Sequence, residues 1–268
     1  MSVVLKLQHY CALQIAKNII EKIIDFEDIE EVGDDLKALV YFNLLDFKYK
    51  AEHPGGTPFI VACEEGEVEH VKLYIQYFFL NKDYRHMTLK EVINSVGKRS
   101  NGVNRTTSSW TALLTASQQG HLDIVKLLYK HGGDLNMPDS GGYTCLMSAA
   151  GNRHERVVEF LLANGADITS TTKYGLTALH YAVLNGTIDI IQQILKHPLS
   201  PIILNKHDKN GHTPMDKAHH IDNFEYRIKV IELIRSHIIR LQIEKSRQCT
   251  NHETHSSFSS TVESTNVI

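Results

Sequence analysis

The chain has no long uncharged apolar run and little that would direct it to a membrane. Its longest apolar stretch, residues 74–80, is interrupted by Gln76, whereas a membrane-spanning helix needs about 20 mostly apolar residues. The first residues also lack an apolar core followed by a cleavage site. We therefore expect neither secretion nor a membrane partner.

Cysteine is scarce and neither sign of charge dominates. The 268 residues include four cysteines, none at a spacing typical of a metal site, and the net charge is −3. A chain without an excess of basic residues offers no general attraction for nucleic acid. We expect reduced thiols, a cytoplasmic or nuclear location and no nucleic-acid partner.

Signatures of catalysis are missing as well. The sequence has no phosphate-binding glycine loop, nucleophile elbow or kinase motif. Sixteen histidines raise the question of a metal site, but the cluster formed by His207, His212, His219 and His220 lacks a cysteine or carboxylate at zinc spacing. We expect no enzymatic activity, no cofactor and no metal.

The chain does contain an internal repeat. A Thr is followed five residues later by an Ala in five places: Thr57–Ala62, Thr111–Ala116, Thr144–Ala149, Thr177–Ala182 and Thr213–Ala218. Successive Thr residues lie 54, 33, 33 and 36 residues apart. The period is therefore 33, with one insertion of 21 residues and another of 3.

Each repeat unit predicts two short helices. The Thr can cap the first helix, and Pro58 and Pro214 stand in a first-turn position that needs no N–H donor. A Val/Leu cluster about a dozen residues later has the spacing of an apolar helical stripe. Gly132 and Gly165 stand where a left-handed residue would end the second helix. No single helix pair can bury its stripe, so the units must stack.

A 33-residue period built on a Thr-Pro-Leu-His-x-Ala core resembles the ankyrin repeat, and residues 51 to about 240 carry the resemblance. His121, His154 and His180 fall where ankyrin units often carry His. The resemblance implies an all-α solenoid of stacked helix pairs with helical N- and C-terminal caps. We place five units in residues 51–247, with the last unit as a cap that ends in a long helix, and expect a disordered Ser/Thr-rich tail at 248–268.

The insertion at about 81–101 predicts a short amphipathic helix. Thr88 and Glu91 form a capping-box pattern, and one face carries Leu89, Val92, Ile93 and Val96. This helix either packs on the first two units or recruits a partner.

Residues 1–50 predict two amphipathic helices around an acidic stretch. The spacing of Leu7, Cys11 and Ile15 places them on one helical face, and it resembles the elongin C-binding box of SOCS-box and VHL-box proteins. That resemblance implies elongin C as a partner and a role as the substrate receptor of a cullin-type ubiquitin ligase. Lys6 and Val32-Gly33 depart from the usual box. The other interpretation is an N-terminal cap over the first repeat.

Ankyrin proteins bind partners through their turn tips and first helices, so the resemblance implies a module that binds a protein through the concave face of the stack. We expect the chain to be a monomer. The predicted contact residues are Trp110, Tyr143, Leu176 and His212 before each Thr, Lys173, Tyr174, Lys209 and Asn210 in the turns, and Gln118, Gln119, Leu184 and Asn185 on the first helices. Trp110, the single Trp, is ranked first because aromatics often anchor interfaces. In the alternative, Trp110 packs against the insertion and compensates for a weak turn at Ser109.

Overall fold

A computed structural model describes residues 39–40, 42–44, 57–77, 86–97 and 110–259. In this part of the chain almost every element is a helix, and the strands are two pieces of two residues each. None of the helices described there is both long and apolar enough to cross a membrane. Leu7, Cys11, Ile15 and most of the N-terminal segment lie outside the described residues.

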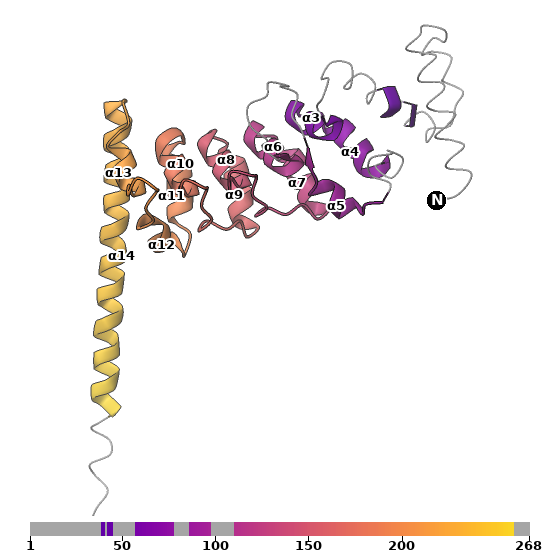
Figure 1. Cartoon of the computed structure of the whole chain (residues 1–268). Coiled ribbons are helices and arrows are strands. Elements are labelled where there is room, and N and C mark those ends of the chain that lie inside the picture. The colour runs from indigo at the N-terminus through magenta and orange to yellow at the C-terminus, as the bar shows by residue number, and fades with distance from the viewer. Residues whose placement is uncertain (1–38, 41, 45–56, 78–85, 98–109, 260–268) are drawn as a thin grey trace, which may run out of the picture.

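The helices form two rows that run side by side along the molecule (Figure 1). The first row contains α3 (Pro58–Glu65), α6 (Ala112–Gln119), α8 (Cys145–Gly151), α10 (Ala178–Asn185) and α13 (Pro214–Ala218). The second row contains α4 (Val68–Tyr77), α7 (Leu122–Lys130), α9 (Glu155–Ala163), α11 (Ile188–Leu195) and α14 (Phe224–Ser259). Each helix contacts the equivalent helix of the next unit. The predicted all-α repeat solenoid is therefore confirmed.

The repeated Thr begins the first helix of each unit. Thr111 Oγ1 accepts a hydrogen bond from the Leu114 N–H at 3.1 Å, and Thr213 forms a reciprocal capping box with Asp216. Thr57 makes no such side-chain cap, and Pro58 follows it. Since these caps satisfy N–H groups that have no partner within the helix, they specify where each short helix starts.

The core lies between the two rows and repeats with the sequence. Positions 33 residues apart are fully buried in three consecutive units, including Ala116, Ala149 and Ala182 in the first row and Val125, Val158 and Ile191 in the second. The small Ala side chain lets the first-row helices approach closely. The branched residues fill the space between rows, so each unit completes the core of its neighbour.

The insertion contains one short helix, α5 (Leu89–Ile93), as predicted, and its capping box is present. Val92 and Ile93 are buried against the stack. The placement of Val96 on the same helical face was wrong. The helix ends before it, and Val96 lies in β1 (Val96–Gly97), which pairs antiparallel with β2 (Trp110–Thr111) and leaves the Val96 side chain 51% exposed.

Asn94, directly after α5, links the insertion to the repeats. Its side-chain amide donates to the carbonyl oxygen of Gly132 at 3.0 Å, and its Oδ1 accepts from the Asp134 N–H at 2.8 Å. One unit later, Asn136 makes the same two contacts with Gly165 and Asp167. The insertion therefore ends as a repeat unit ends, which favours packing on the stack over recruitment of a partner.

The final helix, α14, stands at the C-terminal end of the solenoid and projects well beyond it (Figure 1). Its buried residues Val230 and Ile234 belong to the core. The long final helix was predicted, but the boundary at 247 was wrong for the backbone, because α14 continues to Ser259. The sequence from 248 to 259 contains neither Gly nor Pro, so nothing in it breaks the helix.

A matched pair of glycines separates backbone strain from steric conflict. Gly165 has φ +85° with open space around an added Cβ, whereas Gly120 has φ +82° and an added Cβ would lie 2.4 Å from His154 Nδ1. We expect Gly165→Ala to lower the free energy of unfolding by about 1 kcal/mol through strain alone. Gly120→Ala should cost about 2 kcal/mol more, since the ring must move. Urea denaturation measures both, and equal losses would show that the ring yields freely.

Candidate partner-binding surface

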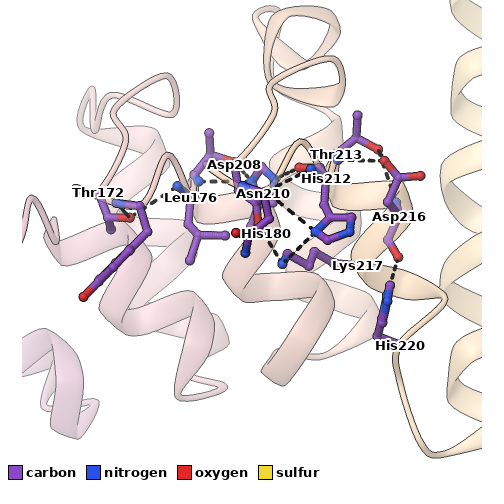
Figure 2. Close-up of polar contacts among 12 residues, drawn as sticks. Thr172, Leu176, His180, Asp208, Asn210, His212, Thr213, Asp216, Lys217 and His220 are labelled. Atoms are coloured by element: carbon purple, nitrogen blue, oxygen red, sulfur yellow. Dashed lines mark hydrogen bonds and ion pairs between the residues drawn. The ribbon is translucent and has the colours of Figure 1, made fainter.

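A network of polar contacts lies in the turn before α13 and centres on Asp208 (Figure 2). Asp208 Oδ1 accepts hydrogen bonds from the N–H groups of Asn210 at 2.8 Å and His212 at 2.9 Å. Its Oδ2 lies 2.6 Å from Lys217 Nζ, with the two side chains only 4% and 17% exposed. Burial raises the pKa of this carboxyl, but the bonds from Lys217, His212 and Asn210 outweigh it and hold the pKa of Asp208 well below its usual range.

The two preceding turns use the same geometry. Asp139 Oδ1 accepts from the N–H groups of Gly141 and Tyr143 at 2.7 and 2.8 Å. In the turn between those of Asp139 and Asp208, Thr172 takes the place of the Asp. Its hydroxyl accepts the equivalent bonds from the N–H groups of Tyr174 and Leu176, both at 3.3 Å. The bonds are longer because a neutral hydroxyl replaces the charged carboxylate as the acceptor.

Backbone hydrogen bonds connect each turn to the next. The Lys173 N–H donates to the carbonyl of Gly141 at 2.8 Å, and the Lys209 N–H donates to the carbonyl of Tyr174 at 2.9 Å. These bonds fix the distance between neighbouring tips. Side chains on different tips are therefore presented as one continuous, rigid row.

His180 connects the start of α10 to the following turn (Figure 2). Its Nδ1 accepts from the Thr177 N–H at 3.1 Å, so Nε2 carries the proton and donates to the His212 carbonyl at 3.3 Å. Burial lowers the pKa of His180, which favours this neutral ring. His121 and His154 also contact the preceding unit, through the carbonyls of Glu64 and Gln118 at 3.0 and 2.7 Å. All three histidines hold neighbouring units together.

The predicted contact residues divide into two groups by exposure. Those exposed to solvent are Gln119, Lys173, Tyr174, Asn185, Lys209 and Asn210, and those half-buried are Trp110, Gln118, Tyr143, Leu176, Leu184 and His212. Among the aromatic residues in this set, Tyr174 is the exposed one, at 63%. The turn tips therefore offer more free side-chain surface than the first helices do.

Trp110, which was ranked first among the predicted contact residues, does not lie on an open surface. It belongs to β2, pairs with Gly97 of the insertion, and packs half-buried against the hydrophobic core. Trp110 therefore belongs to the packed part of the molecule, because strand β1 of the insertion pairs with the strand that contains it. Contact between Trp110 and the insertion was the alternative interpretation of this residue. A role for Trp110 in partner binding stays a prediction.

Tyr181 on α10 was missed by the sequence analysis. Its ring lies 5.3 Å from the ring of Tyr143, so the two aromatics form one half-buried patch behind the turn tips. Burial raises the pKa of the Tyr181 hydroxyl. The repeat contained a signal for it: the positions one and two units earlier hold the small residues Ser148 and Thr115, so a Tyr there is an outlier.

A hollow of about 540 Å³ lies between α11, α12 (Ser200–Leu204) and α14. Apolar residues that include Leu195 and Leu233 line it, together with the charged residues Lys196, Arg240 and Glu244. Since both signs of charge are present, the lining does not select one class of ligand. The hollow could not be predicted from the sequence, because its walls come from segments about 40 residues apart.

The Asp208–Lys217 pair is testable through the pH dependence of stability. We expect Lys217→Met to lower the free energy of unfolding by about 1–3 kcal/mol at pH 7 and to raise the pKa of Asp208. Because the folded-state pKa is depressed, the contribution is complete above pH about 4 and is lost as the pH falls through the folded-state value. The difference in free energy of unfolding between Lys217→Met and the wild type should therefore become smaller in acid.

Lys209→Met is the matched control, since Lys209 is an exposed lysine in the same turn. Its free energy of unfolding should equal that of wild type. Equal losses in both variants, or a difference that does not narrow in acid, would show that the ion pair does not stabilise the turn.

Sequence comparison agrees with this geometry. Residues 83–172 match the family model for ankyrin repeats, in three copies, and residues 174–202 match an ankyrin repeat. No curated protein matches the chain. Beyond the matched span, the structure adds one helix pair before it, α3 with α4, and one after it, α13 with α14. The chain is therefore an ankyrin-repeat protein, and its repeats form a protein–protein interaction module.

Proposed function

We propose that the chain is a non-enzymatic adaptor, in the cytoplasm or nucleus, that binds a protein partner through its turn tips and first helices. The observation that carries the proposal is the row of linked tips. Backbone bonds hold them in register, and they expose Lys173, Tyr174, Lys209 and Asn210. A surface that is rigid before binding loses little conformational entropy when the partner docks.

The chemistry of the tips favours one kind of partner. Tyr174 offers a large exposed ring, and Lys173 and Lys209 place cationic groups on the same tip and the next one. Aromatic residues are common binding anchors, and charges around them speed association and select partners of opposite sign. We therefore propose a partner that presents an apolar group flanked by carboxylates.

Two aromatic variants test which residue is the anchor. Tyr174→Ala should weaken partner binding by about 2 kcal/mol and leave the free energy of unfolding unchanged, because the ring is exposed. Trp110→Ala should lower the free energy of unfolding by about 2 kcal/mol, because the ring packs on the core. The partner would be captured from lysate with the wild-type chain, and its affinity for each variant measured by calorimetry.

Lys126→Ala is the control for the opposite row, since Lys126 is exposed on α7. This variant should bind like wild type. A loss of affinity with Lys126→Ala but not with Tyr174→Ala would place the partner on the second-row helices and contradict the proposal.

The alternative function is that of a substrate receptor that recruits elongin C through Leu7, Cys11 and Ile15. Its support is the four-residue spacing of these side chains. Leu7→Ala combined with Cys11→Asp should abolish elongin C binding in a purified pull-down and leave partner binding at the tips intact. If the segment instead caps the stack, the same change should lower the melting temperature. A wild-type chain that does not bind elongin C at micromolar concentration would remove the ligase role.

A further inference from the structure

The outer face of α14 has no neighbour among the described residues. One side of this helix contacts α11 and α13 and contributes Val230 and Ile234 to the core. The opposite side is at the end of the solenoid, where Figure 1 shows no further element. A terminal solenoid helix usually has a polar outer face, because that face meets water.

The outer face of α14 instead carries large apolar side chains among polar ones. Phe224, Ile228, Ile239 and Ile243 are 65%, 38%, 56% and 48% exposed, and they make up four of the large apolar side chains found exposed in the described part of the chain. Two exposed charged residues, Glu232 and Arg235, lie between them in sequence. At about 100° per residue, all six fall within roughly one third of the helix circumference. We call this set the outer stripe.

The outer stripe has the same order of apolar and charged residues whether it is followed from its N-terminal or its C-terminal end. From Phe224 to Ile243 the spacings are 4, 4, 3, 4 and 4 residues, and the order is apolar, apolar, charged, charged, apolar, apolar. Spacings of this kind repeat every 11 residues, which keeps a stripe on one side of a nearly straight helix. Such a stripe can meet a reversed copy of itself over its whole length, about 30 Å.

We propose that the partner of the outer stripe is a second copy of this chain, bound antiparallel about a two-fold axis that passes between Glu232 and Arg235. In that arrangement Phe224 faces Ile243 and Ile228 faces Ile239 of the other copy. Each Glu232 faces an Arg235. Every contact occurs twice, as in other isologous two-fold interfaces.

The central charges set the direction of the pair. In the antiparallel arrangement each carboxylate meets a guanidinium, whereas parallel helices would place Glu232 against Glu232 and Arg235 against Arg235. Like charges in direct opposition disfavour the parallel arrangement. The apolar residues supply the attraction, and the charges select its orientation. This inference departs from the monomer expected from the sequence, and it uses residues separate from the turn tips.

Sedimentation velocity of the full chain tests the dimer. We expect a species of twice the 30.4 kDa chain mass at tens of micromolar, and its dissociation on dilution. Ile239→Glu with Ile243→Glu should give a monomer at the same concentration. The control variant, Arg240→Ala with Lys245→Ala, changes net charge by the same amount on other faces of α14 and should remain dimeric. Circular dichroism would verify that both variants are folded.

A charge swap tests the orientation. Glu232→Arg should raise the dissociation constant about ten-fold or more, because two like-charged contacts replace two ion pairs. Adding Arg235→Glu to the same chain should restore the wild-type constant. A wild-type chain that stays monomeric at about 100 μM overturns the proposal, as does a control variant that dissociates. A double swap that fails to restore the dimer overturns the antiparallel arrangement.

Discussion

Contact between neighbouring units is the constraint on which the rest of this structure depends. Helices as short as α6 and α8, with 8 and 7 residues, are unstable in isolation. They persist because each buries its apolar side against the next unit, and because polar side chains connect the units. His154 reaches back to Gln118, and Asn136 reaches forward to Gly165 and Asp167. The 33-residue period maintains both contacts from one unit to the next.

The same constraint separates the residues that build the molecule from those that can recognise a partner. Asp208 and Thr172 point into their own turns and bond backbone N–H groups, so they determine the shape of the tips. Lys173 and Tyr174 are exposed from one of those tips. Their side chains can change without altering the fold, and this freedom allows one repeat architecture to bind very different proteins.

The features that could be predicted from the sequence are those that are local and repeated. The Thr111 cap and the Gly165 conformation each depend on a few neighbouring residues, and repetition made them visible. Val96 and Trp110 could not be placed, because their pairing joins two segments across an interruption of the period. The exposed tip residues could be named from the repeat register, but their relative exposure required the packing of adjacent units. Leu7, Cys11 and Ile15, on which the elongin interpretation depends, lie outside the described residues.

The pairing of β1 with β2 has an evolutionary consequence. The chain leaves the first unit at Gly97 and enters the second at Trp110, and these two residues are register partners. Just before this exit, the Asn94 side chain forms hydrogen bonds with the backbone of the second unit. Because the exit and the entry are held together, the number of residues between them can change without shifting the repeats on either side. This junction is therefore a place where the solenoid can gain or lose sequence, or accept an inserted domain, while its stacking order is preserved.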